Sequence, residues 1–321
     1  MPMRLFINAF WQNVRACGTM VVCPMPFEAF EPVNAGASPG SVLLTCRFLL
    51  HAGSGSAALQ LDFLKMRCGF QKQKELSPIV HIIADLHLGA SVDKPMQVFG
   101  PEWENHTQTI KRKWLETVSP GDTVFLPGDF SWGIDLEETL ADFLFLEQLP
   151  GKKILSKGNH DYWWTTVSKM QQFLLQHGIS SIDFLHNNAF AVEGMIVCGA
   201  KGYQWDAQES AAQNEKLTNR EAIRLELSLK KGVSLQKKLP GYERAELVAL
   251  LHYPPVTAGQ KSGRFLELFQ QYGVRRCFYG HIHGPATAAA LTGWHQGVEF
   301  SLVSADFLSF CPQKLNKTVS F

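Results

Sequence analysis

From Ser77 onward, the sequence alternates short apolar runs with longer amphipathic stretches, and this alternation limits the possible folds more than any other feature. The apolar runs all close in polar residues: PIVHIIAD (78–85), DTVFLPGD (122–129), KKILSKGNHD (152–161), AELVALLHYPP (245–255) and VRRCFYGHIHG (274–284). Short strands are expected near 182–199, and segments with helical character lie at 104–118, 136–149, 167–178, 219–232 and 263–273. Continuous apolar runs are typical of strands covered on both faces, so the pattern predicts an α/β domain.

The first part of the chain, residues 1–77, lacks this order. Its acids are few: Glu28, Glu31, Asp62 and Glu75. It contains Gly/Ser/Ala-rich patches such as NAGASPGS and no sustained period, so we interpret it as a poorly ordered N-terminal extension or the product of an early start codon. An accessory domain and a transit peptide are the alternatives; polar residues interrupt the early apolar run too soon for a secretory signal. The principal domain is then expected at 78–321.

Composition limits the possible partners and compartments. The formal net charge of +1 gives no electrostatic argument for nucleic acid or an anionic membrane. Seven scattered cysteines without a C-x-x-C pair predict free thiols and hence a cytoplasmic protein. No segment approaches the roughly 18 uninterrupted apolar residues of a membrane span.

The polar residues that close the apolar runs are the types that bind metals. They are Asp85 and His87 in ADLHLG, Asp129 in PGDF, Asn159 in GNHD, His252 in LHYPP, and His281 with His283 in YGHIHG. In open α/β sheets, ligands bind beyond the carboxyl ends of the strands. Seven such side chains are too many for one tetrahedral ion but fit two neighbouring ions, and their mixture of oxygen and imidazole nitrogen favours Mn, Fe or Zn over a thiolate-type site.

Each cluster taken alone has an ordinary structural explanation. A Gly-Asp pair is usually a turn, GNHD has the composition of a turn, and the histidines of GHIHG could lie on the surface. Five clusters in succession, each beside an expected strand, make a shared site the better interpretation.

In this order, D-x-H, G-D, G-N-H-D, an isolated His and G-H-x-H resemble the calcineurin-like metallophosphoesterase superfamily. The resemblance covers about 78–311, and WENHTQTI, GKKILSKGNHDYWW and GVEFSLVSADFLSF are similar to a bacterial group of uncharacterised predicted phosphohydrolases. It implies an α/β/β/α sandwich, in which two mixed sheets are flanked by helices and the metals lie at the strand ends.

The resemblance also implies a role for each matching residue. Ligands of the first metal would be Asp85, His87 and His283. Ligands of the second would be Asn159, His252 and His281. Asp129 would bridge the two ions.

Two further residues of the GNHD motif are implied to be catalytic. His160 would lie beside the scissile phosphate, where it stabilises the phosphoryl oxygens and helps to protonate the leaving group. Asp161 would fix the His160 tautomer by accepting a ring N–H. The alternative for His160 is an eighth ligand or a hydrogen-bond donor behind the ligands.

The predicted function is hydrolysis of a small phosphomonoester, phosphodiester or nucleotide, by attack of a hydroxide that bridges two divalent transition-metal ions. A phosphoprotein phosphatase is disfavoured, because GDFSWG and LSKGNH lack the arginines that the protein-phosphatase branch carries at these motifs. A nuclease has no support from the near-neutral charge. The alternative from another class is a non-catalytic, metal-stabilised interaction module.

Several polar and aromatic residues near the motifs are weaker candidates for the substrate cleft. Trp103, His106, Tyr203, Gln204 and Trp205 could line it. Arg220 and Arg224 could hold phosphate, although an exposed helix face is the ordinary explanation for both. The three aromatic residues 162–164 are expected to be core or pocket wall.

We predict that a chain beginning at Lys74 folds, binds metal and hydrolyses substrate as well as the full chain. Every residue assigned to the chemistry lies at or beyond Asp85, and an acid-poor, patchy leader has little burial to offset its ordering entropy. Limited proteolysis should cut before residue 77 and leave a stable core. An insoluble truncated chain, or one that loses metal and activity together, would show that residues 1–77 are a structural element.

Overall fold

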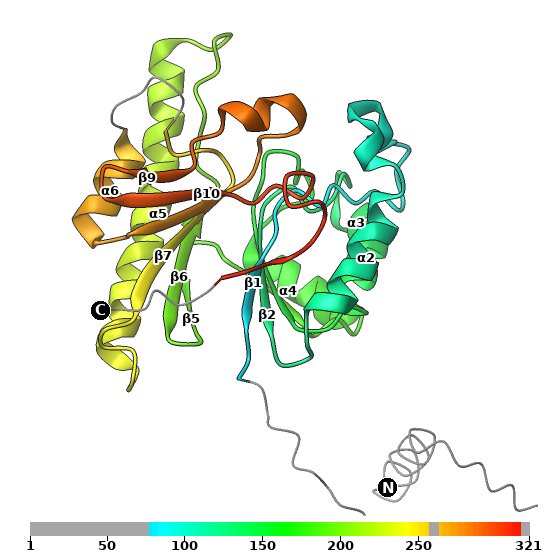
Figure 1. Ribbon diagram of the computed structural model, residues 1–321, viewed down its shortest axis with the longest axis horizontal. Helices are drawn as coiled ribbons and strands as arrows, with labels where there is room; N and C mark the ends of the chain where they lie inside the picture. Colours follow the sequence, from blue (N-terminus) through cyan, green and yellow to red (C-terminus); the bar gives the residue numbers. More distant parts are fainter. Residues whose placement is uncertain (1–76, 257–262, 316–321) are drawn as a thin grey trace, which may run out of the picture. The chain divides into compact units, whose positions relative to one another are not determined.

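The computed structural model describes residues 77–256 and 263–315 (Figure 1). The prediction of a poorly ordered extension over residues 1–77 therefore lies almost entirely outside the described residues. The domain beyond it is an α/β fold of two mixed sheets flanked by helices, as predicted.

The first sheet has the strand order β11-β1-β2-β3-β4. Its strands are β1 (Val80–Ile82), β2 (Thr123–Pro127), β3 (Lys152–Ser156), β4 (Ile182–Phe184) and β11 (Gln313–Lys314). The first four are mutually parallel, and β11 pairs antiparallel with β1. Parallel neighbours require crossover connections, which the intervening helices supply.

The second sheet has the order β5-β6-β7-β8-β10-β9. Its strands are β5 (Ala189–Val192), β6 (Met195–Ala200), β7 (Glu246–Leu251), β8 (Arg276–Tyr279), β9 (Gly293–His295) and β10 (Val298–Leu302). The central four are parallel, while β5 and β9 are antiparallel edges. The chain after β1 joins the two sheets, since the Ala84 N–H donates to Val303 O at 2.8 Å.

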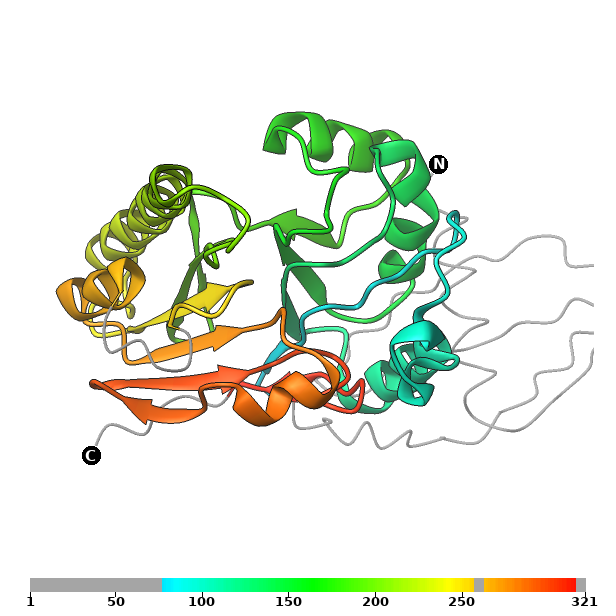
Figure 2. The same ribbon diagram turned by 90° about the horizontal axis from the view of Figure 1, so that it is seen from above.

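Helices cover the outer face of each sheet (Figures 1 and 2). The first sheet carries α2 (His106–Thr117), α3 (Leu136–Glu147) and α4 (Val167–Gln176), and the second carries α5 (Ala211–Lys238) and α6 (Arg264–Tyr272). Short 3-10 helices lie at η1 (Met96–Phe99), η2 (Pro101–Trp103) and η3 (Gly284–Ala289).

Side-chain alternation along the strands divides the core into three layers. In β2, Phe125 lies in the cluster between the sheets, whereas Val124 and Leu126 pack toward the helices. In β7, Val248 and Leu250 face the first sheet, while Leu247, Ala249 and Leu251 lie under the helices. A period of two with both faces apolar is what a strand buried on both sides requires, so the continuous apolar runs build the α/β/β/α sandwich.

Polar residues and a proline set the limits of several helices. Asp135 and Thr166 accept N–H bonds at the starts of α3 and α4, and Ser210 does so for α5. α5 begins about two turns before the predicted helix, because its first turns are polar and show no apolar period. It ends before Pro240, which disfavours helical geometry at the preceding Leu239.

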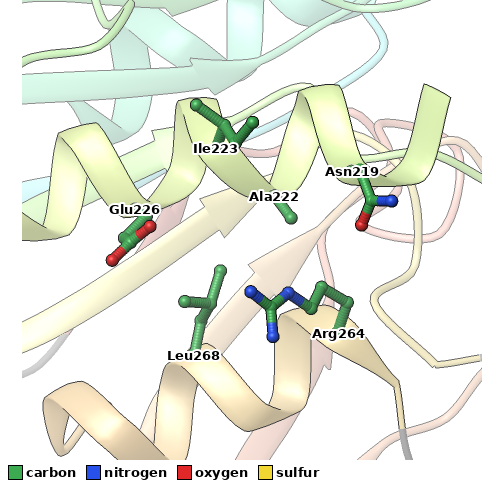
Figure 3. A pocket seen from close by; sticks show the side chains of 6 residues that line it. All are labelled: Asn219, Ala222, Ile223, Glu226, Arg264 and Leu268. Atoms are coloured by element: carbon green, nitrogen blue, oxygen red, sulfur yellow. The ribbon is translucent and has the colours of Figure 1, made fainter. Parts of the chain in front are cut away.

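A cavity of about 130 Å³ lies between α5 and α6 (Figure 3). Six side chains line it: Asn219, Ala222, Ile223, Glu226, Arg264 and Leu268. Leu268 points toward α5 in Figure 3, and none of the predicted metal ligands takes part.

Among the helices of the described residues, none combines the length and the apolarity that a membrane span would need.

Candidate dinuclear metal centre

The predicted ligands follow the ends of five strands that belong to both sheets. Asp85 and His87 come after β1, Asp129 after β2 and Asn159 after β3. From the second sheet, His252 follows β7, and His281 and His283 follow β8. The structure brings them together at the edge where the two sheets meet.

The first donor group consists of Asp85, His87 and His283. One ligand atom from each lies within 4.8 Å of the others, and Asp85 Oδ1 is 3.7 Å from His283 Nε2. Asp85 and His87 are buried. His283 Nε2 is itself buried and has no hydrogen-bond partner among the described residues, so it can bind an ion that displaces its proton.

The second donor group consists of Asp129, His252 and His281, again within 4.8 Å. Asn159 adds an oxygen, because its Oδ1 lies 2.6 Å from His252 Nε2. Asp129 also reaches toward the first group: its Oδ2 is 3.4 Å from His252 Nε2 and 3.8 Å from His87 Nε2. One carboxylate oxygen between two histidines of different groups is the arrangement that a bridging ligand needs.

Four ligands adopt left-handed backbone geometry, which L-residues rarely populate. The φ angles are 60° at Asp85, 44° at His87, 51° at Asp129 and 71° at His281. Such strain persists where the surroundings enforce it and is concentrated at functional sites. The turns direct these side chains into the centre at some cost in conformational energy.

Glycines next to the ligands allow the loops to approach one another. A Cβ on Gly158 would overlap the Asp129 carboxylate, and one on Gly280 would overlap the Asp85 carboxylate. The glycines of G-N-H-D and G-H-x-H therefore have a steric role: each lets a carboxylate from another strand occupy the space beside the backbone.

The electrostatics of the centre favour cations. Burial and the neighbouring Asp85 charge raise the pKa of Asp129 to about 8, whereas hydrogen bonding and charge from His283 hold the pKa of Asp85 below its ordinary value against the effect of burial. Burial lowers the pKa of His281 to about 3 and that of His87 well below its ordinary value. Metal ions bind neutral imidazoles and ionised carboxylates. Burial already favours the neutral form of His87 and His281, and a bound cation would displace the proton that burial favours on Asp129, so the donor set fits metal cations.

Asp306 contacts His283 of the first donor group on the ring nitrogen that does not face the other predicted ligands. The sequence alone did not single out Asp306. Its Oδ1 lies 2.9 Å from His283 Nδ1, and its Oδ2 accepts the Gly284 N–H at 2.8 Å. Burial opposes the charged form of His283, but the hydrogen bond to Asp306 and the nearby carboxylates of Asp85 and Asp306 outweigh it and raise its pKa to about 10. A carboxylate on the far nitrogen of a ligand histidine fixes the ring orientation. The available signal was the SADF stretch of the resemblance.

Asp161 has different partners from those predicted. Its Oδ2 accepts the N–H groups of Asp129 and Gly158 at 2.9 and 2.7 Å, and its Oδ1 accepts those of Phe130 and Trp163 Nε1 at 2.9 and 3.1 Å. The ring of His160 is not among these partners. Asp161 is fully buried, and its geometry makes it a positioning residue that ties the G-N-H-D loop to the G-D loop.

His160 lies beside the donor groups without belonging to either. Its backbone N–H donates to Asp129 Oδ1 at 2.8 Å, and its ring centroid is 5.7 Å from that of His87 and 4.4 Å from that of Trp132. Burial, followed by the charges of His252 and Lys94, lowers the pKa of His160 to about 4. The ring is thus a neutral imidazole at pH 7 that can donate one hydrogen bond.

Aromatic residues pack around the ligand rings. Trp132 stacks on His87 with their ring centroids 4.9 Å apart. The ring centroid of Trp103 is 5.8 Å from that of His87 and 5.6 Å from that of His283. Trp103 is 1% exposed, so it supports the ligands from within the core instead of lining an open cleft. His106 holds the same loop, since its Nε2 lies 3.3 Å from His87 O.

The other weaker candidates have mixed positions. Trp163 and Trp164 are buried, as expected for core residues, while Tyr162 and Trp205 are exposed. Tyr203 lies beside Asn214, to which its hydroxyl donates at 2.9 Å.

A family model described as calcineurin-like phosphoesterase matches residues 79–285. Gene 66 protein of Mycobacterium phage L5 is 32% identical over 78 residues, which are 24% of this chain and 37% of the phage protein. The chain therefore spans little more than a third of that relative's length.

Two solved structures are similar at low identity. One is AQ665 from Aquifex aeolicus, a protein of unknown function. It is 14% identical to this chain with a TM-score of 0.41, and the match covers 74% of this chain and 96% of AQ665. The other is the phosphopantetheinyl hydrolase PptH from Mycobacterium tuberculosis. It is 15% identical to this chain with a TM-score of 0.45, and the match covers 76% of this chain and 98% of PptH.

We predict that Asp161→Ala lowers the free energy of unfolding by about 3 kcal/mol or more and reduces metal content, because each lost hydrogen bond to a buried charge contributes roughly 1.5–3 kcal/mol. Chemical denaturation and elemental analysis measure the two effects. Asp135→Ala, which removes only the N-cap of α3, serves as the control and should cost about 1 kcal/mol with no loss of metal. Lost activity with unchanged stability and metal content would instead assign Asp161 to the His160 ring.

Proposed function

The chain belongs to the calcineurin-like phosphoesterase family, and we propose that it is a dinuclear metal-dependent phosphoesterase acting on a small phosphorylated substrate. The substrate would be a phosphomonoester, a phosphodiester or a nucleotide. Nucleic acid and membranes are not among the proposed partners. A reducing, cytoplasmic location is part of the proposal.

The observation that carries this proposal is the pair of donor groups joined through Asp129. Asp85, His87 and His283 would hold one ion, and Asn159, His252 and His281 the other. Asp129 Oδ2 lies between His87 and His252, so one residue would serve both ions.

The donor chemistry suits Mn, Fe or Zn, because neutral imidazole nitrogens and carboxylate oxygens are combined without a thiolate. When bound, two such ions polarise phosphoryl oxygens and make water acidic enough to react near neutral pH. The protein residues would orient these ions, and the buried neighbours of the ligand rings would limit the access of bulk water.

His160 would act on the substrate itself. The bond from its backbone to Asp129 Oδ1 fixes the residue against the carboxylate shared by the two groups. The ring centroid of Trp132 is 4.4 Å from that of His160, so Trp132 restricts the position of the His160 ring. From this position a neutral imidazole can donate a hydrogen bond to a phosphoryl or leaving-group oxygen, and its charge state changes on proton transfer.

The first prediction from the proposed function concerns the number of metal ions bound per chain. Protein purified without chelator should contain close to two transition-metal ions per chain, and Asp129→Ala should lose more metal and more activity than His281→Ala, because only Asp129 reaches both groups. Elemental analysis and hydrolysis of bis-p-nitrophenyl phosphate measure the two effects. Asp93→Ala, an exposed acid, is the control.

Two results would count against this prediction. A stoichiometry of one under excess metal would contradict the dinuclear centre. Two bound ions with no turnover over a panel of monoesters, diesters and nucleotides would favour the non-catalytic module.

The second prediction concerns His160. His160→Ala should retain both ions and lower kcat by about 10²–10⁴-fold, the range expected for a residue that transfers a proton or stabilises the leaving group. The loss should be smaller for p-nitrophenyl phosphate than for phenyl phosphate, because p-nitrophenolate needs less protonation. His177→Ala, a histidine at the end of α4, is the control. Loss of metal in His160→Ala would make His160 a ligand.

A further inference from the structure

A small hollow of about 10 Å³ lies at the ends of strands from both sheets, and basic side chains surround it. Lys157 directly follows β3, Lys201 directly follows β6, and His186 comes shortly after β4. Glu221 and Arg224 of α5 complete its polar lining. Residues from four elements thus converge at one place, which the sequence indicates only through Arg220 and Arg224 as weaker candidates for holding phosphate.

Glu221 organises the positive charges from within the core. Its side chain is 0% exposed, and its Oε1 accepts from Arg224 Nη1 at 2.6 Å and from Arg220 Nε at 3.2 Å. The arginines remain accessible, with 35% of the Arg224 side chain and 50% of the Arg220 side chain exposed. Glu221 is therefore a positioning residue that fixes two guanidinium groups and leaves part of each open to solvent. We call Lys157, Lys201, Arg220, Glu221 and Arg224 the Glu221 cluster.

The charge of the Glu221 cluster is not balanced. Four basic side chains share one carboxylate, and over residues 77–256 and 263–315 neither Lys157 nor Lys201 has an acidic oxygen within ion-pair distance. The excess of positive charge therefore has no carboxylate partner of its own in these residues, as a purely structural salt-bridge network would have.

The cluster lies close to the metal centre along the backbone. Lys157 is two residues before Asn159, and Lys201 O accepts the N–H groups of His252 and Tyr253 at 3.1 and 2.9 Å. β3, which precedes Lys157, is the direct neighbour of β2, which precedes Asp129. Neighbouring strands lie about 5 Å apart, so the backbone of Lys157 is within roughly one or two strand spacings of the predicted ligands.

We propose that the Glu221 cluster binds a second anionic group of the substrate, a phosphate or a carboxylate several bonds away from the scissile phosphate. This inference rests on the proposed phosphoesterase function. Guanidinium groups match the oxygen geometry of both anions, and the two ammonium groups add charge without directional demands. The substrate class is accordingly a bisphosphate or a phosphorylated carboxylic acid.

The test compares ligands that differ only in the second anion. Alkanediol bisphosphates of three to six carbons and alkyl monophosphates of equal length are measured as inhibitors of p-nitrophenyl phosphate hydrolysis by the metal-loaded full chain. The best bisphosphate should bind about 10- to 100-fold more tightly than its monophosphate, the range for one or more charge-assisted bonds. That advantage should vanish in Arg220→Gln/Arg224→Gln, in which the glutamine amides can still donate to Glu221.

Two further variants separate the role of the cluster from general charge and folding. Lys237→Ala removes a positive charge from the last turn of the same helix and should keep the bisphosphate advantage. Arg224→Lys retains the charge but not the guanidinium fork, so it should keep only part of the advantage. Equal metal content in all variants shows that the centre is intact. An undiminished advantage in the double glutamine variant would overturn the inference.

A second readout does not depend on turnover. Equilibrium dialysis of the metal-loaded chain with labelled inorganic phosphate should find one more phosphate bound in the wild type than in Arg220→Gln/Arg224→Gln. If that difference is present but no phosphoester is hydrolysed, the proposed function fails while the anion site stands. If hydrolysis is present and the difference is absent, the anion site is wrong while the proposed function stands.

Discussion

Two buried carboxylates, Asp85 and Asp129, are the constraint on which the rest of this structure depends. They follow the adjacent parallel strands β1 and β2, and in a medium of low dielectric constant two like charges so close repel strongly. Burial, and after it this repulsion, raises the pKa of Asp129 to about 8. Burial favours the neutral form of His87, His252 and His281, so of the histidines around the two acids only His283 offers Asp85 a positive charge. Metal cations are the natural counter-charge, and the strained turns that present the ligands are consistent with a centre built to receive them.

A second set of acids holds the loops without competing for the ions. Asp161 gathers N–H groups from the loops after β2 and β3, and Asp306 fixes His283. Asp142 does the same further out, because its oxygens accept from the Ala90 N–H, after β1, and from the Ser131 hydroxyl, after β2. A buried carboxylate can accept hydrogen bonds from several N–H groups at once. These bonds therefore fix the conformation of the loops that hold the predicted ligands, although the loops are neither helix nor strand.

The metal centre and the Glu221 cluster share one edge of the sandwich but differ in how they bring charge together. The candidate metal centre places two carboxylates close together, so its positive charge would come from metal ions. The Glu221 cluster instead places basic side chains around one buried carboxylate. A phosphate ester needs positive charge at the reacting group, and a second anionic group needs it a short distance away. The α/β arrangement supplies both, because the strands of the two sheets end at the same side and α5 runs past them (Figure 1).

The sequence by itself determined the α/β class, the order of the main strands and helices, and the candidate ligand set. These features are encoded locally: apolar runs specify strands buried on both faces, and the residues after each run are of metal-binding types. Only the tertiary structure decided the partners of Asp161, the place of Asp306 behind His283, the contact of Trp132 with two histidines, and the convergence on Glu221. The strands β9 and β11 were likewise not predicted, because segments of three and two residues show no period. β10 was also missed, although VEFSL alternates buried and half-buried residues. The side-chain contacts come from separate elements, and contacts between side chains distant in sequence leave no periodic signal in either partner.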